Sequence, residues 1–122
     1  MGKRILAVEN DADILEILDI ILTSEGYEVI TSTTGQDIIP IIQICKPDIV
    51  LMDIRLGFLD GREVCKTIKT NERTKHTPVF LMSAHAREED VMQDSCADGF
   101  IPKPFDFDKL RSGLENQLSV KL

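Results

Sequence analysis

Short apolar runs alternate along this chain with longer stretches in which apolar residues recur every three or four positions. The clearest run, Ile49 to Met52, has no polar interruption and ends at a carboxylate, Asp53. Such a run is typical of a strand buried on both faces of a parallel sheet. The predicted strands are residues 5–8, 27–32, 49–52, 79–82 and 99–101, of which 27–32 is the most polar and is predicted to be an edge strand.

A segment with helical spacing follows each predicted strand. The predicted helices cover residues 12–25, 36–45, 61–70, 87–95 and the C-terminal stretch that places Phe107, Leu110, Leu114 and Leu118 on one face. Asp11 and Asp60 are expected to cap two of them, and Gly26 to end the first. Pro40 costs about 3 kcal/mol inside a helix. The second helix is therefore expected to start late, with Pro40 in its first turn, or otherwise to be kinked.

Five strand–helix units predict a three-layer α/β/α sandwich with a five-stranded parallel sheet and right-handed crossovers. The 122 residues are expected to form one domain with no separate effector domain. A net charge of −7 argues against nucleic acid or an anionic membrane as the main partner. No apolar stretch is long enough for a signal peptide or membrane span, and three scattered cysteines predict buried free thiols, so a cytoplasmic location is expected.

Polar side chains follow four of the predicted strands, at their carboxyl ends. They are Glu9 and Asn10, Asp53, Ser83 and Lys103. Each alone has a simpler explanation, as a cap, a strand-end hydroxyl or a solvated lysine. In a parallel sheet, however, all of them meet at one edge, where α/β proteins bind ligands. Carboxylate and amide oxygens suit a hard divalent cation, and a lysine beside a hydroxyl suits a phosphoryl group.

The motifs that contain these residues are similar to those of a known protein family. Glu9-Asn10-Asp11, Leu51-Met52-Asp53-Ile54 with Asp60-Gly61, Ser83-Ala84 and Lys103-Pro104-Phe105 resemble the receiver domain of two-component response regulators. The resemblance covers essentially the whole chain, residues 1–122. It implies a flavodoxin-like fold with strand order 2-1-3-4-5, and transfer of a phosphoryl group from a phosphohistidine to an aspartate.

The resemblance assigns a role to each matching position. It implies that Asp53 is the phosphoacceptor, that Ser83 and Lys103 bind the phosphoryl group, and that the Lys103–Pro104 bond is cis. It implies that Mg²⁺ is held by Glu9, Asn10, Asp53 and the backbone carbonyl of Arg55. Phe100 would switch rotamer with Ser83, whereas Arg55 and His85 would tune the lifetime of the phosphate.

The chain departs from the family pattern at four places. Asn10 replaces an acidic metal ligand, which removes an attraction of a few kcal/mol at an effective dielectric near ~20 and predicts weakly bound Mg²⁺. Gly57 replaces a proline and is expected to loosen the loop after Asp53. Phe100 replaces the commoner tyrosine. The interval from Ser83 to Lys103 is about two residues short, so the helix at 87–95 should be short or irregular.

The expected function is therefore that of a single-domain response regulator. A histidine kinase or phosphotransfer protein would dock near the helix at 12–25 and phosphorylate Asp53. The signal would then pass by protein contact to an unknown downstream partner, from a monomer or a phosphorylation-dependent dimer. It would not be a conventional enzyme, although it would catalyse its own phosphorylation and dephosphorylation.

Three other functions are alternatives to this one. The first is a degenerate receiver that binds partners without phosphorylation, which Asn10 favours. An aspartate-nucleophile phosphatase is disfavoured because Arg55 stands where that class has a second aspartate. A flavin or dinucleotide carrier is disfavoured because no glycine-rich loop follows the strand at 5–8.

Overall fold

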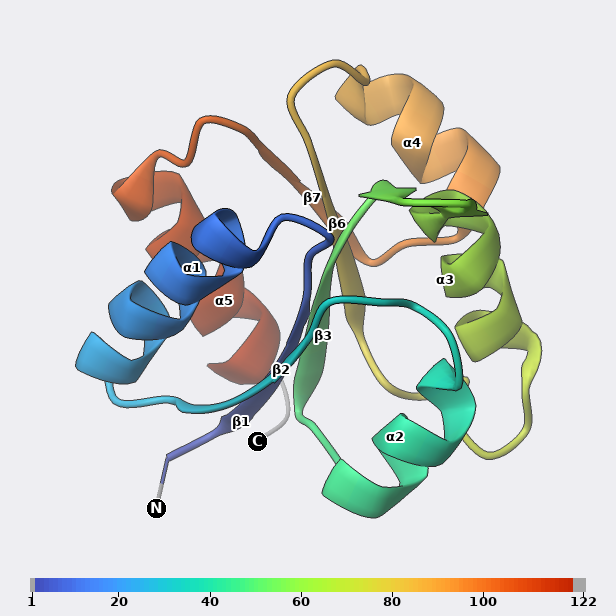
Figure 1. The fold of residues 1–122 in the computed structure, drawn as a ribbon, viewed down its shortest axis with the longest axis horizontal. Helices are drawn as coiled ribbons and strands as arrows, with labels where there is room; N and C mark the ends of the chain where they lie inside the picture. Colours follow the sequence, from blue (N-terminus) through green and yellow to red (C-terminus); the bar gives the residue numbers. More distant parts are fainter. Residues whose placement is uncertain (1, 120–122) are drawn as a thin grey trace.

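The molecule is built on a central sheet of five parallel strands, and a computed structural model describes residues 2–119 of it (Figure 1). In order across the sheet, the strands are β2 (Glu28–Ser32), β1 (Arg4–Val8), β3 (Ile49–Asp53), β6 (Val79–Ser83) and β7 (Gly99–Pro102). This is the predicted 2-1-3-4-5 order, with the polar strand β2 at one edge. The flavodoxin-like fold is therefore confirmed.

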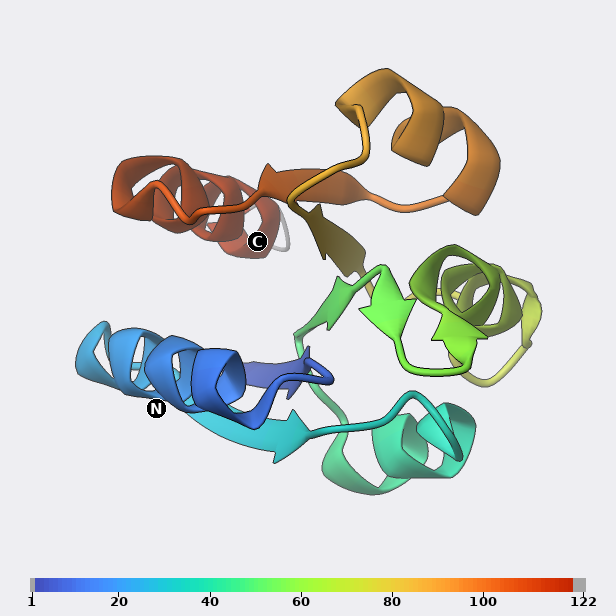
Figure 2. The ribbon, with the colours of Figure 1, turned by 45° about the horizontal axis from the view of Figure 1, so that its top comes forward.

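Five helices cover the two faces of the sheet, as Figure 2 shows. They are α1 (Ala12–Ser24), α2 (Ile38–Cys45), α3 (Gly61–Thr70), α4 (Glu88–Ser95) and α5 (Phe107–Ser119). Helices α1 and α5 lie on one face, and α2, α3 and α4 lie on the other. The β–α alternation and the three-layer arrangement agree with the sequence pattern, and α4 is short, with eight residues, as its spacing predicted.

Alternate side chains of each central strand feed two separate cores, because successive strand residues point to opposite faces. On β3, Val50 and Met52 pack with α2, α3 and α4, whereas Ile49 and Leu51 pack with α1 and α5. All five residues of β3 are buried. The strand that leads to Asp53 is thus held from both sides, which fixes the position of that carboxylate at the edge of the sheet.

The predicted helix ends are present. The Asp11 carboxylate accepts hydrogen bonds from the backbone N–H groups of Asp13 and Ile14 at the start of α1, and Gly26 follows α1 with φ +95°. The Asp60 carboxylate caps α3. Helix α2 begins at Ile38, so Pro40 lies in its first turn and no kink is needed.

Phe107, Leu110 and Leu114 line the same pocket, as expected for residues on one face of α5, and Phe107 is 54% exposed in its first turn. One prediction about side-chain burial is wrong. The three cysteines were expected to be buried thiols. Cys65 is buried, but Cys45 is half-buried, and Cys96 is exposed because it lies after the end of α4.

A small antiparallel hairpin follows β3 and was not predicted. Its strands are β4 (Arg55–Leu56) and β5 (Leu59–Asp60). Gly57 has φ +68°, which a two-residue hairpin turn with glycine in first position requires. The loop that contains Gly57 is therefore a paired hairpin, which lies below α4 in the upper half of Figure 1. That Gly57 loosens this loop stays a prediction.

Within residues 2–119, no helix is long and apolar enough to cross a membrane.

Candidate functional site

The register of the sheet gathers the predicted site residues at one edge. Met52 pairs with Val8 and Asp53 with Met82, so Glu9 lies beside Asp53 on one side and Ser83 on the other. On the next strand, the backbone N–H of Lys103 donates to the carbonyl oxygen of Ser83 at 3.0 Å. Four residues distant in sequence are therefore brought to the carboxyl ends of four neighbouring strands, as the sequence predicted.

The Lys103 ammonium lies between the two carboxylates. Its Nζ atom is 2.5 Å from Glu9 Oε1 and 3.2 Å from Asp53 Oδ2. The side chains of Glu9, Asp53 and Lys103 are 2%, 10% and 14% exposed. Two acids and one base thus share a nearly dry space, in which opposite charges attract more strongly than they do in water. The peptide bond between Lys103 and Pro104 is cis, as predicted.

The ionisation of this group follows from burial and pairing. Burial raises the pKa of Glu9, and its ion pair with Lys103 offsets only part of that effect. For Lys103, burial alone would lower the pKa, but the bonds to Glu9 and Asp53 outweigh burial and raise the pKa above its ordinary value. The lysine is therefore charged at neutral pH.

Ser83 is at the same edge, but its hydroxyl serves the loop that follows. Its Oγ atom accepts hydrogen bonds from the backbone N–H groups of His85, at 3.1 Å, and Ala86, at 3.0 Å. The serine is 9% exposed. Phe100 is half-buried on β7 and packs against the core that faces α2, α3 and α4. His85 is exposed.

Asn10 and Arg55 lie at the outer rim of the site. Asn10 is exposed, and its Oδ1 atom is 3.6 Å from the point where a Cβ atom on Gly57 would stand. Together with Arg55 and Phe58, it lines a shallow hollow of about 580 Å³. Asp11 is committed elsewhere, since its carboxylate caps α1 and its N–H donates to Glu9 Oε2.

The groups available for a metal ion are oxygen donors. Among residues 2–119, no cluster of three or more His, Cys, Asp or Glu side chains could hold a metal. The donors at this edge are the two carboxylates of Glu9 and Asp53, the Asn10 amide and the Arg55 carbonyl. Their chemistry fits a hard divalent cation, which takes oxygen ligands and keeps several waters. Lys103, however, already neutralises part of the negative charge.

Gly61 lies closer to the backbone of Asp53 than the sequence alone indicates. A Cβ atom at Gly61 would stand 2.3 Å from the carbonyl oxygen of Asp53 and 2.9 Å from the Cα of Ile54. Its N–H also donates to the Ile54 carbonyl oxygen at 2.7 Å. Because Gly61 has no Cβ atom, the start of α3 can contact the backbone of Asp53 directly.

An apolar pocket of about 370 Å³ opens beside Lys103, at the edge of the sheet that carries Asp53. It lies between α1, which contributes Ile14 and Ile17, and the segment that contains Pro104 and Phe105; Lys103 also lines it. Sequence reasoning did not predict it, because the two walls are distant in the chain. Ile17 is 54% exposed at this pocket.

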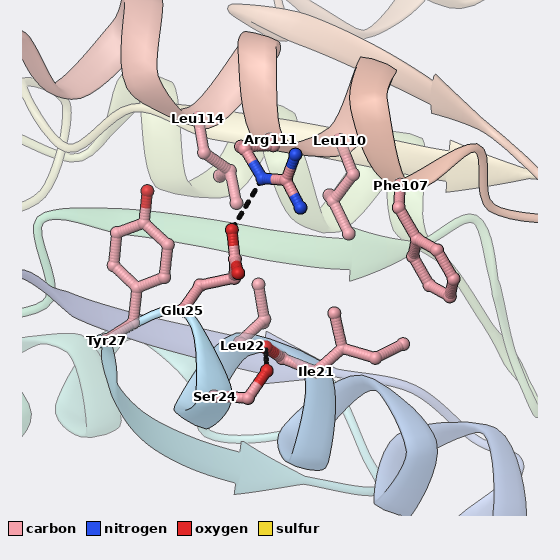
Figure 3. Close-up of a pocket in the computed structure, with 9 residues that line it drawn as sticks. All are labelled: Ile21, Leu22, Ser24, Glu25, Tyr27, Phe107, Leu110, Arg111 and Leu114. Atoms are coloured by element: carbon pink, nitrogen blue, oxygen red, sulfur yellow. Dashed lines mark hydrogen bonds and ion pairs between the residues drawn. The ribbon is translucent and has the colours of Figure 1, made fainter.

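A second apolar pocket, of about 190 Å³, lies between α1 and α5 (Figure 3). Figure 3 shows the Arg111–Glu25 ion pair, 2.5 Å long, reaching across it, with the exposed Phe107 ring at one end. None of the predicted site residues lines this pocket. It is therefore a crevice between packed helices and not part of the candidate site.

The fold and the residues at this edge of the sheet define a class of protein. It is a flavodoxin-like domain with two carboxylates, a lysine and a hydroxyl at the carboxyl ends of its parallel strands. A family model narrows this class, since the model of the response regulator receiver domain matches residues 5–115. The chain belongs to the response regulator receiver family.

Relatives and solved structures agree with this assignment. The chain is 32% identical over 109 residues to the DNA-binding dual master transcriptional regulator RpaA of Synechocystis sp., which covers 88% of this chain and 45% of RpaA. It therefore spans less than half the length of this curated relative. A response regulator from Chloroflexus aurantiacus is 26% identical, with a TM-score of 0.89 over 98% of this chain and 99% of that one.

A further neighbour bears on the metal. It is the receiver domain of the sensor histidine kinase PA1611 from Pseudomonas aeruginosa, described with a magnesium ion coordinated in its active-site cleft. It is 26% identical to this chain, with a TM-score of 0.86 over 98% of this chain and 99% of that one.

Proposed function

We propose that Asp53 accepts a phosphoryl group from a histidine kinase or phosphotransfer protein, and that residues 1–122 act as one receiver domain. The observation that carries this proposal is the position of Lys103, with its ammonium 3.2 Å from an oxygen of a carboxylate that still reaches the surface. A nucleophilic carboxylate next to a fixed positive charge is what phosphoryl transfer requires.

The reaction follows from these placements. An Asp53 oxygen attacks phosphorus in line, so that a P–O bond forms while the P–N bond to the donor histidine breaks. Lys103 neutralises negative charge on the phosphoryl oxygens. The Ser83 hydroxyl then leaves the N–H groups of His85 and Ala86 and donates a hydrogen bond to the phosphoryl group, and Phe100 moves inward after it. Water later hydrolyses the acyl phosphate, at a rate that Arg55 and His85 tune from the rim.

Mg²⁺ would be held by Glu9, Asp53, Asn10 and the carbonyl of Arg55, and when bound it would supply positive charge to the phosphoryl oxygens. Because Asn10 contributes no charge and Lys103 is paired with Glu9, binding should be weak. Lys103 and Mg²⁺ would compete for the carboxylate of Glu9.

The apolar pocket beside α1 supports docking of the donor at that helix. A protein that brings a phosphohistidine to Asp53 must cover the adjacent surface, where Ile17 and Phe105 offer apolar contact. Added charge at Asp53 would then bias the face formed by α4, β7 and α5, which a downstream protein reads by contact in the cytoplasm. Because α4 has only eight residues, we expect the shape of this face to differ from the usual shape in the family.

Intact mass after exposure to acetyl phosphate and Mg²⁺ tests the proposal. One phosphoryl adduct is expected on the unmodified chain, none on Asp53→Ala, and one on Asp108→Ala, which removes a 91% exposed carboxylate from α5 as a matched control. An adduct that persists in Asp53→Ala would overturn the assignment of the acceptor.

A degenerate receiver is the second candidate, favoured by Asn10 and by the lysine that already occupies the space between the two carboxylates. It predicts no adduct with either acetyl phosphate or a protein donor. It also predicts partner binding that is unchanged in Asp53→Ala.

A further inference from the structure

A second polar pocket lies at the opposite end of the sheet from Asp53. It is formed by residues from the connection between α2 and β3 and from the loop between α3 and β6, both in the lower half of Figure 1. Its cavity measures about 390 Å³. The two ends of β3 are about 13 Å apart at ~3.3 Å per residue, so this pocket is separate from the acceptor edge.

Three basic side chains line this pocket. They are Lys46 from the end of α2 and Arg73 and His76 from the α3–β6 loop, and all three are exposed. None of them has an ion pair with a carboxylate of the described residues. In a chain of net charge −7, this convergence of unpaired basic groups is unexpected.

The neighbouring cations behave differently. Lys66 pairs with Glu63, Lys69 with Asp98 and Lys75 with Glu72, at distances between 2.9 and 3.2 Å. These three lysines do not line the pocket, and each of them is neutralised by an acid of the chain. The basic residues that line the pocket are left for an anion from outside.

The rest of the lining is apolar or neutral. Ile42 and Pro47 are buried at the floor, and Gln43 and Thr77 add an amide and a hydroxyl. The volume exceeds that of an inorganic phosphate and falls in the range of small-molecule sites. The pocket combines a cationic rim with an apolar floor, which suits an anionic group joined to a compact organic body.

We propose that this pocket binds a small organic phosphate such as a mononucleotide. The guanidinium of Arg73 would hold two phosphate oxygens as a fork, with Lys46 as a point charge and His76 as a further N–H donor. The organic body would rest on Ile42 and Pro47. Binding does not depend on phosphorylation of Asp53.

A simpler explanation covers only part of the cluster. A lysine near the end of a helix stabilises the partial negative charge of the last carbonyl groups, which accounts for Lys46 at the end of α2. It does not account for Arg73 and His76, which come from a different segment. The partial negative charge of the last carbonyl groups of α2 would repel a bound phosphate. We therefore place the phosphate nearer to Arg73 than to the end of α2.

Titration of the isotope-labelled full chain with adenosine 5′-monophosphate, followed by amide NMR at low salt, tests the proposal. Saturable shifts are expected at residues 42–47 and 73–77, and adenosine without its phosphate should cause none. Arg73→Gln and Lys46→Gln should each weaken binding by about tenfold or more, the effect of losing one charge-assisted contact.

Lys75→Gln is the matched control, because it removes the same charge from the same loop at a side chain that pairs with Glu72 and does not line the pocket. It should leave the affinity unchanged. An equal loss in Lys75→Gln would reduce the effect to diffuse charge and overturn the site, as would shifts confined to Glu9, Asp53 and Lys103. Asp53→Ala should bind the nucleotide as the unmodified chain does, whether or not Asp53 proves to be the phosphoacceptor.

Discussion

At the carboxyl ends of the strands, Lys103 lies between Glu9 and Asp53 with its side chain 14% exposed, whereas at the amino ends Lys46 and Arg73 stand exposed without a carboxylate partner. The first group is placed by neighbouring strands whose register fixes every member. The second is placed by a helix end and a loop. Changes at the first edge should therefore alter stability and chemistry together, while changes at the second should alter ligand binding alone.

The largest effect is expected from Gly61→Ala. The new methyl group would stand 2.3 Å from the Asp53 carbonyl oxygen, and only movement of the backbone could relieve the clash. We expect a loss of about 4 kcal/mol in the free energy of unfolding, measured with urea, together with slower phosphorylation by acetyl phosphate.

Gly113→Ala in α5 is the control for Gly61→Ala. Its nearest contact would be 3.3 Å, to the end of the Phe80 ring, and alanine favours helix, so stability should change by no more than about 1 kcal/mol. If the two variants were equally stable, the close approach of α3 to the acceptor would have no energetic importance.

Lys103→Met should have the next largest effect. It leaves the buried Glu9 carboxylate beside Asp53 without its cation, and breaking such a pair costs about 3 kcal/mol at neutral pH. Lys109→Met, at an exposed lysine of α5, should cost almost nothing. Urea unfolding of both variants measures the difference, and equal midpoints would refute the importance of the ion pair.

The cost of Lys103→Met should depend on pH in a definite direction. Because the folded pKa of Glu9 is raised by burial, the carboxyl takes up a proton more readily in the folded chain than in the unfolded one. The loss of stability caused by Lys103→Met should be largest above the raised pKa of Glu9 and become smaller as the pH falls through it.

In the unmodified chain, the raised pKa of Lys103 predicts that the stabilisation by the ion pair is lost as the pH rises through the pKa of Lys103. Unfolding midpoints across a pH series measure both limits.

Asn10→Asp should produce a moderate effect on metal binding. It adds a carboxylate at an exposed position beside Glu9, and we expect Mg²⁺ to bind about tenfold more tightly, or roughly 1.4 kcal/mol. Calorimetric titration with Mg²⁺ measures this change. An unchanged titration midpoint would contradict the view that residue 10 limits the affinity.

The smallest effect on stability is expected at the amino edge. Arg73→Gln removes an exposed side chain that has no ion pair among the described residues, so the free energy of unfolding should stay within about 0.5 kcal/mol. The same urea experiment used for Lys103→Met checks this. A loss comparable to that of Lys103→Met would mean that the two edges do not differ in the way proposed.

Most of the fold follows from local patterns. The strand that ends at Asp53 was predictable because four consecutive apolar residues have few alternatives, and the start of α2 followed from where proline is tolerated. The hairpin of β4 and β5 was missed because two-residue strands carry no periodicity. The exposure of Cys96 was missed because the number and spacing of the cysteines do not reveal where each one lies relative to the end of a helix.

Some features of the candidate site could also be predicted from the sequence, and others could not. Glu9, Asp53, Ser83 and Lys103 could be placed together because parallel strands bring their carboxyl ends to one edge. That Lys103 bridges both acids, and that the Ser83 hydroxyl binds its own loop, depends on rotamers that sequence does not specify. The pocket of Lys46, Arg73 and His76 could not be predicted, since its parts come from two segments that only packing brings together.

The unequal surroundings of the cysteines have a practical consequence for these experiments. Burial raises the pKa of Cys65 to about 12 and also raises the pKa of Cys45, so both thiols should resist alkylation at neutral pH. Cys96 is exposed where α4 ends, four residues before the aromatic ring of Phe100. A maleimide fluorophore should therefore attach there without any engineered cysteine, and its emission would follow rearrangement of this region in real time.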